Sequence, residues 1–350
     1  MNNLTASQIH AVVRSAVLAP SADNRHHVAF EPTAGGMRIW ADDQYANCAE
    51  PHRRQLTVFS FGAVLENALI QASAYALDSA VRAFPDPDRP KLVCELEWRP
   101  ADAPVDPLLR AIDQRHTNRK FFKGPPLAEL ELALLADEVR RYESVRIHWC
   151  DDAERRSALL GQVRRAEAER FRQPRLHEEL FSSIDWSAGW KATSVEGLPP
   201  GALEVEVPLR PGFRAMSSWP VMRVLSLLQM HRLLGIRAAD LPCRLSPHLG
   251  VLSATDARTS TVIEAGRAFQ RLWLQATLQG LALQPMAASI ALALQPVADG
   301  WVSGEVQRAL QMGWTRLIGA DSPMMVFRLG RAPTPAVRAS RRPVQSYLMQ

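Results

Sequence analysis

The sequence predicts an α+β protein in which mixed sheets pack on long central helices. Residues 56–77 are apolar on nearly all sides, and residues 261–281 form a second long apolar segment, which favours two buried helices. Short segments of alternating apolar and polar residues predict strands. Helix, strand, long helix and strand follow one another in residues 1–100, and a similar order in residues 127–330 indicates an internally duplicated, single-chain pseudo-dimer.

The first half, residues 1–106, begins with a helix that Thr5 or Ser7 can cap, because its apolar residues recur at helical spacing. Gly35 and Gly36 form a turn between two strands. The predicted elements are a helix to residue 17, strands 27–31 and 37–41, the helix 56–77 and a strand 91–98.

The second half, residues 107–350, contains a segment of unclear pattern at 181–245 that is rich in aromatic residues. Its tryptophans can form a lid over a bound group or an ordinary aromatic core. The predicted elements around it are helices 127–141, 153–171 and 261–281, strands 145–150, 248–253 and 324–330, and a helix near 221–234 inside it. The last residues, 333–350, are rich in Pro and Arg and predict an extended arm.

Composition narrows the class of protein. The chain has 350 residues, of which 47% are apolar and 22% charged, so it can bury a real core. A net charge of +5 suits anionic small molecules and is weak support for nucleic acid. Four scattered cysteines have no metal-ligand spacing, and neither a secretory start nor a membrane-length apolar run is present. We expect a cytoplasmic protein without a metal, nucleic-acid or membrane partner.

A basic stretch at residues 114–122 is the first candidate site. Arg115 and Arg119 bracket His116 and Thr117, and Gly124 and two prolines follow. Guanidinium groups offer a positive charge and bidentate hydrogen bonding to a phosphate, and short polar groups can bond to its remaining oxygens. Alone, the stretch is more typical of a solvated helix end, where basic residues favour the dipole.

Three further segments could join it, although each alone fits a loop, a helix end or a solvated tail. Small residues at 280–288 would let the backbone approach a flat ligand closely. Catalytic triads, phosphate loops and dinucleotide fingerprints are missing from the sequence. The candidate residues of the three segments are Pro20, Ser21 and Asn24, then Pro285, Met286 and Ala287, and finally Arg341 and Arg342.

Together these segments resemble the nitroreductase family of FMN-dependent oxidoreductases. Residues 115–121 look like its Arg-x-Ser-x-Arg/Lys-x-Phe opening, 20–24 like its Pro-Ser-x-x-Asn loop, and 280–288 like its Gly-(x)4-Pro-Ile-x-Gly segment. The resemblance implies a phosphate site and a flavin-facing backbone. By this resemblance the phosphate would contact Arg115, Arg119, Arg341 and Arg342. The ribityl chain or the ring edges would contact Ser21, Asn24, His116 and Thr117. Flavin N5 would face the backbone of Pro285, Met286 and Ala287.

The order of the motifs is similar to that of the single-chain, internally duplicated (Acg-like) branch of the family. The Pro-Ser loop lies in the first half here, and the basic opening begins the second half. This order implies one FMN per chain in a monomeric pseudo-dimer or a weak homodimer. His26 and His27 stand where many members have Gln-Pro, and Ala287-Ala288 replace an acidic residue and glycine, so the substrate face departs from the family.

The resemblance implies hydride transfer from NAD(P)H through flavin N5 to a small-molecule substrate, with NADP as one product and without a catalytic side chain. Two alternatives remain open. The chain could sequester FMN with little turnover, or it could be a biosynthetic FMN-dependent dehydrogenase of a specific metabolite or peptide.

Overall fold

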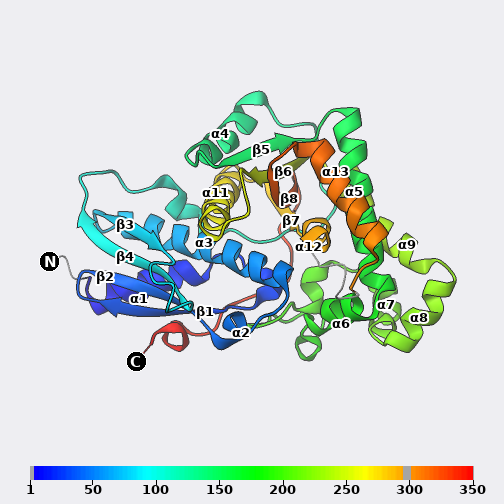
Figure 1. Cartoon of the computed structure of the whole chain (residues 1–350), viewed down its shortest axis with the longest axis horizontal. Coiled ribbons are helices and arrows are strands. Elements are labelled where there is room, and N and C mark those ends of the chain that lie inside the picture. The colour runs from blue at the N-terminus through cyan, green and yellow to red at the C-terminus, as the bar shows by residue number, and fades with distance from the viewer. Residues whose placement is uncertain (1–3, 295–300, 350) are drawn as a thin grey trace.

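Two four-stranded sheets and a pair of long helices organise the computed structural model, which describes residues 4–294 and 301–349 (Figure 1). The sheets have the orders β1-β2-β4-β3 and β5-β6-β8-β7, so strands are connected alike in both. The strands are β1 (Val28–Thr33), β2 (Gly36–Ala41), β3 (Leu77–Ala83), β4 (Leu92–Pro100), β5 (Val145–Trp149), β6 (His248–Ala254), β7 (Ala282–Met286) and β8 (Ser322–Gly330). This repeated connection agrees with the duplication that the order of elements predicted.

Helices cover and separate the sheets, which confirms the α+β class. The helices are α1 (Ala6–Val17), α2 (Asp43–Ala46), α3 (Pro51–Ser73), α4 (Glu129–Arg140), α5 (Ala153–Arg172), α6 (Pro174–Ser182), α7 (Arg210–Met216), α8 (Trp219–Leu227), α9 (Met230–Gly235), α10 (Leu241–Leu245), α11 (Thr259–Leu278), α12 (Ala288–Leu294) and α13 (Gly304–Ile318). Short 3₁₀ turns lie at 22–24, 107–111, 186–188, 200–203, 207–209 and 344–347, and a π-helical turn spans 236–240.

Local chemistry sets the start of the first half. The Thr5 side chain accepts a hydrogen bond from the Gln8 backbone N–H, and the Gln8 side chain accepts one from the Thr5 N–H, so a capping box begins α1. Gly35 has a φ of 83°, which suits the tight turn between β1 and β2. A side chain at Gly36 would meet the Leu96 carbonyl at 2.1 Å, so β4 can approach only a glycine there.

Several elements differ from the sequence-based expectation. The named strands pair only antiparallel, whereas we expected mixed sheets; an isolated parallel bridge joins Phe30 to Leu348 beside β1. Helix α3 begins at Pro51, earlier than the predicted residue 56, because proline is suited to a first helical position. It ends at Ser73, before the predicted residue 77. Strands β3 and β7 were not expected.

Helices α3 and α11 cross at the centre, where two glycines let the backbones touch. A side chain at Gly62 would meet the Ile263 carbonyl at 2.2 Å, and one at Gly266 would meet the Phe59 carbonyl at 2.0 Å. The contact is therefore reciprocal, as in a twofold dimer interface. One hydrophobic cluster includes side chains from both helices and from both sheets, so the halves share a core.

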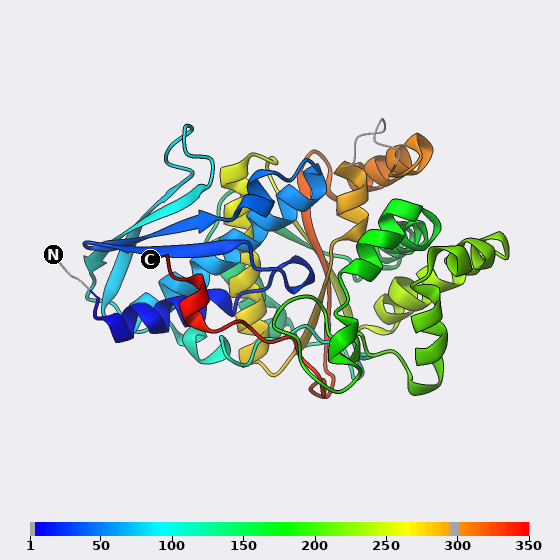
Figure 2. The same cartoon turned by 90° about the horizontal axis from the view of Figure 1, so that it is seen from below.

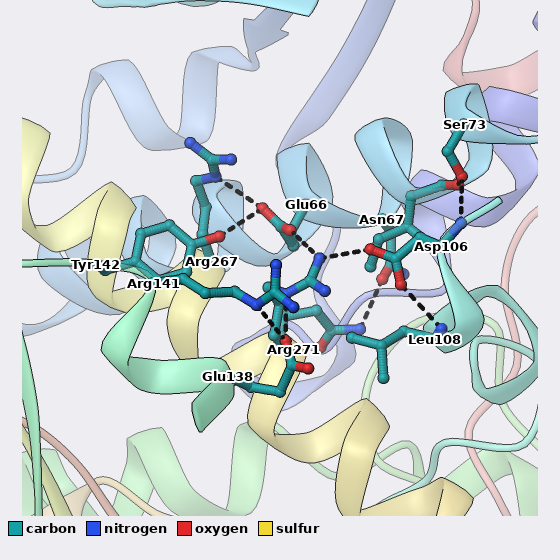
Figure 3. Close-up of polar contacts among 12 residues, drawn as sticks. Glu66, Asn67, Ser73, Asp106, Leu108, Glu138, Arg141, Tyr142, Arg267 and Arg271 are labelled. Atoms are coloured by element: carbon teal, nitrogen blue, oxygen red, sulfur yellow. Dashed lines mark hydrogen bonds and ion pairs between the residues drawn. The ribbon is translucent and has the colours of Figure 1, made fainter. Parts of the chain in front are cut away.

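A buried ionic network holds the same crossing together (Figure 3). Glu66 on α3 is 3% exposed and accepts hydrogen bonds from Arg267 (2.7 Å), Arg271 (2.9 Å) and the Tyr142 hydroxyl (2.9 Å). Arg271 also pairs with Asp106 (2.8 Å) and Glu138 (2.6 Å). Because these side chains come from α3, α4, α11 and the connection between the halves, the network fixes their relative positions.

Helix α3 is long and apolar enough to cross a membrane by composition, but 67% of the relevant window is buried inside the protein, as in a core helix.

Seen from below, α7, α8 and α9 lie at the opposite end of the molecule from the first sheet (Figure 2). The predicted division at residues 106 and 107 remains a prediction; Asp106 itself belongs to the network that joins the two parts.

Candidate functional site

The loop after α1 turns sharply through two left-handed residues. Asp23 and Asn24 have φ values of 54° and 57°, a conformation that Asp and Asn tolerate better than most residues. The Asn24 side chain is buried and bonds to two other segments. Its amide donates to the Ser194 (3.3 Å) and Gly197 (3.1 Å) carbonyls, and its oxygen accepts from Arg341 (2.7 Å).

Arg341 reaches back from the C-terminal arm to the end of α1. Its guanidinium donates to the Val17 carbonyl (2.5 Å), the Ala19 carbonyl (2.9 Å) and the Asn24 side chain. Carbonyls at a helix C-terminus attract a cation. The described residues include no carboxylate within ion-pair distance of it, and burial lowers the pKa of Arg341 to about 10.

Arg115 approaches the same point from the basic stretch. It donates to the Leu18 carbonyl at 2.9 Å, and its guanidinium carbon lies 4.4 Å from the centre of the Trp273 ring. Burial, followed by repulsion from Arg341, lowers the pKa of Arg115 to about 9. Guanidinium groups stay protonated in proteins. We therefore interpret the lowered pKa of Arg115 as a sign that its charge lacks a nearby anion, rather than as deprotonation.

Unpaired polar atoms mark the same place. Within residues 4–294 and 301–349, the buried side-chain atoms without a hydrogen-bond partner include Ser21 Oγ, Arg115 Nε and Arg342 Nε. Three of the predicted site residues therefore carry a buried donor that the protein leaves unsatisfied, which is costly unless a ligand pairs with it. Arg342 is otherwise held over the Tyr347 ring at 4.6 Å and donates to the His26 carbonyl at 3.4 Å.

His26 helps to position Asn24 without adding charge. Its Nε2 lies 3.2 Å from the Asn24 side-chain oxygen. Burial and then the charges of Arg341 and Arg342 lower the pKa of His26 to about 2, so the ring is neutral and donates from Nε2. The sequence motif did not single out this role.

Arg119 lies farther along the stretch and has a carboxylate near it. Its guanidinium donates to the Ala202 carbonyl at 3.1 Å, and burial lowers the pKa of Arg119 although Asp23 opposes the shift. Burial raises the pKa of Asp23, which Arg170 partly offsets. Asp23 was quoted in the loop motif but was not predicted as a site residue.

The remaining residues of the stretch are held by backbone and by the arm. His116 bonds to the Gln114 carbonyl at 2.7 Å, and burial lowers the pKa of His116; Thr117 is half-buried. Asn118, which was not among the predicted residues, is 1% exposed. Its backbone N–H donates to Leu283 (3.1 Å) and its side chain to Pro333 (3.0 Å), so it fixes the stretch against β7 and the arm.

The segment at 285–287 lies largely in a strand that the sequence did not predict. Pro285 and Met286 are the last residues of β7 and pair with β8. The Met286 sulfur lies 3.3 Å from Cys243 Sγ in a buried cluster, and Ala287 packs against the main core. Hydrogen bonds join the loop, the basic stretch and the arm, and the 280–288 segment joins the basic stretch directly, because the Asn118 N–H donates to the Leu283 carbonyl. Arg328 adds an indirect link, since it donates to both the Gln284 side chain and the Lys120 carbonyl.

Part of the 181–245 insertion covers the site. Ser194 and Gly197 bond to Asn24, and Ala202 bonds to Arg119. Its tryptophans, however, form a separate cluster with Phe181 and Phe213, in which Trp186 lies 5.9 Å from Phe213. They therefore build the insertion's own core, and a backbone segment rather than an aromatic ring lies over the loop.

A narrow hollow lies between the loop and α3, lined by Ser21, His26, Ser60 and Phe61 among others. Its free volume is about 20 Å³, close to that of one water molecule. A group larger than a water molecule would therefore fit this hollow only if the surrounding segments moved.

Comparisons with known proteins agree with the sequence resemblance. No family model matches the chain. It is 25% identical to "Uncharacterized protein MT1398" of Mycobacterium tuberculosis over 95% of this chain and 47% of that protein. It is 28% identical to "Putative NAD(P)H nitroreductase acg" of the same species over 57% of this chain and 59% of that protein. The chain thus spans about half the length of the first relative and less than two thirds of the second.

A solved structure gives a weaker likeness. A nitroreductase with bound FMN from Desulfitobacterium hafniense is 15% identical over 70% of this chain and 98% of its own, with a TM-score of 0.36. The resemblance to the nitroreductase family, and to its Acg-like members, is confirmed by the sequence relatives.

Proposed function

We propose that the chain binds FMN as a nitroreductase-type oxidoreductase and holds its phosphate at the end of α1. The observation that carries this proposal is that Arg115 and Arg341 both reach the end of α1, where no carboxylate of the described residues forms an ion pair with either, beside unpaired donors on Ser21, Arg115 and Arg342. Such a site suits a dianionic phosphate. The relatives' names support the same class, although they describe those proteins.

The polar residues predicted from the sequence then have these roles. Arg115, Arg341 and Arg342 would neutralise the phosphate, and the Ser21 hydroxyl would bond to it or to the ribityl chain. Arg119 stays a prediction for the phosphate, and His116, Thr117 and Asn24 stay predictions for the ribityl chain or the ring edges. When bound, FMN supplies the redox chemistry by taking up a hydride and passing the electrons on. NAD(P)H as donor, a small oxidised substrate and one FMN per chain belong to this proposal.

The test is flavin retention. Arg115→Ala combined with Arg119→Ala should purify with little or no FMN, whereas Arg110→Ala, an exposed arginine just upstream, should retain the wild-type complement. Circular dichroism checks that each variant is folded. A folded double variant with full flavin content contradicts the site assignment, and a wild-type protein that takes up no FMN contradicts the function.

A second candidate, sequestration of FMN with little turnover, is favoured by the covering segment and the small hollow beside Ser21. Mixing the loaded protein with NADPH under anaerobic conditions separates the two. Rapid bleaching of the flavin spectrum supports the reductase. A flavin that stays yellow supports sequestration or a dehydrogenase that does not use nicotinamide.

A further inference from the structure

Exposed apolar side chains concentrate on one part of the insertion. Of the sixteen large apolar side chains that are exposed in residues 4–294 and 301–349, nine lie between residues 207 and 245. Leu227 and Leu228 are 77% and 72% exposed, which are the highest values among them. Exposed apolar side chains that gather in one region often mark a binding surface, whereas singly scattered ones do not.

Six of the nine lie on or directly after helices α8 and α9, which pack against each other at the outer end of the insertion (Figures 1 and 2). Val221, Val224 and Leu228 are spaced by three and four residues, so they share one side of α8. Met222, on another side, is fully buried in the insertion's core. Helix α8 therefore packs on one apolar side and presents a second apolar side to the outside.

The charge of this region has one sign. Residues 207–239 contain five arginines and neither Lys, Asp nor Glu. The whole chain has 41 basic and 36 acidic residues, so outside this region 36 of each remain and the charge is balanced. Arg223 and Arg232, which are exposed beside the leucines, form no ion pair within the described part of the chain. Arg237, by contrast, pairs with Glu206.

We propose that the α8–α9 edge, defined by Val221, Arg223, Val224, Leu227, Leu228, Arg232, Leu233 and Ile236, is a peripheral binding surface for membranes that contain anionic lipids. Leucines would enter the headgroup region, and the arginines would pair with lipid phosphates. A second copy of the chain fits less well, because a twofold contact would set these arginines against each other.

This proposal is independent of the flavin function. It also goes beyond the expectation of no membrane partner, which depended on the absence of a membrane-length apolar run. Peripheral binding does not need such a run, since a short apolar edge with basic neighbours is sufficient for reversible attachment.

Flotation of the full-length protein with lipid vesicles tests it. The wild type should float with vesicles of phosphatidylcholine mixed with phosphatidylglycerol, and it should stay below with phosphatidylcholine alone or in high salt. Arg223→Gln combined with Arg232→Gln should bind roughly thirtyfold more weakly, since each surface arginine contributes about 1 kcal/mol. Leu227→Ser combined with Leu228→Ser should bind more than about tenfold more weakly.

Leu130→Ser is the matched control, because Leu130 is 70% exposed but lies on α4. It should bind vesicles like the wild type. Equal binding by the wild type and both edge variants overturns the proposal, as does a wild type that does not bind anionic vesicles. A dimer in sedimentation that the Leu227/Leu228 variant abolishes, without vesicle binding by the wild type, assigns the edge to a second copy instead.

Discussion

Two groups of buried or half-buried arginines in this chain have opposite surroundings. At the α3–α11 crossing, Arg267 and Arg271 are paired with carboxylates, and the charge of Glu66 holds the pKa of both above its ordinary value although burial opposes this. At the end of α1, Arg115 and Arg341 bond only to neutral oxygens, and burial lowers the pKa of both.

The difference separates a structural role from a binding role. A buried pair whose charges balance is complete in itself, so removing one member leaves an uncompensated charge. Buried cations without a partner are stabilised when an external anion arrives. The two groups should therefore respond in opposite ways to substitution, and the predictions below test that contrast.

The largest effect on the free energy of unfolding is expected for Glu66→Gln. Arg267 and Arg271 would keep their charges while losing the carboxylate that both contact, so the free energy of unfolding should fall by about 3–5 kcal/mol. Urea unfolding followed by circular dichroism measures it. Glu97→Gln removes an exposed partner of Arg99 and should change the free energy by less than about 1 kcal/mol. Similar values for the two variants would show that the network is not structural.

A smaller, pH-dependent effect is expected for Glu179, which ties α6 to the start of α3. Its carboxylate accepts hydrogen bonds from His52 (3.1 Å) and Arg53 (2.6 Å). Burial alone would raise the pKa of Glu179, but these two partners outweigh it and lower the pKa to about 2 from an ordinary 4.5. Because the folded-state pKa is the lower one, the stabilisation is complete above pH 4.5 and is lost as the pH falls toward 2.

Comparing the wild type with Glu179→Gln at several pH values checks this. The advantage of the wild type in unfolding free energy should be about 1–3 kcal/mol at neutral pH and should shrink between pH 4.5 and 2. A difference that stays constant through this window would mean that the carboxylate charge contributes nothing.

The periodicity of apolar residues predicted most helices and strands, but it missed strands β3 and β7. Helix α1 and the long helices were predictable, because apolar residues recur at helical spacing over many residues. Strand β3 follows a left-handed turn at Ala76 (φ 54°), which carries no glycine or proline signal. Strand β7 contains Pro285, which argues against a strand in general but is tolerated here because β7 is at the edge of its sheet.

The site was predictable only as separate segments. The motifs indicated Arg115 and Arg341, whereas their meeting at the end of α1 depends on tertiary contacts between residues more than two hundred positions apart. The network around Glu66 had no local signal at all, since its partners come from distant elements. Asn118 stands between the two arginines of the basic stretch, but its anchoring contacts with Leu283 and Pro333 depend on distant segments and could not be predicted locally.

The smallest effect on stability, and the sharpest contrast with Glu66→Gln, is expected for Arg115→Met. The substitution keeps an unbranched apolar stem and removes a buried charge that has no carboxylate partner, so the loss of the Leu18 hydrogen bond and the Trp273 contact is offset by the removed desolvation cost. In the flavin-free protein the free energy of unfolding should change by less than about 1 kcal/mol. FMN affinity, measured by fluorescence quenching on titration, should fall about tenfold to a hundredfold, because one charge-assisted contact to the phosphate is lost. A variant that is strongly destabilised but binds FMN normally would place Arg115 with the structural arginines and reverse the contrast.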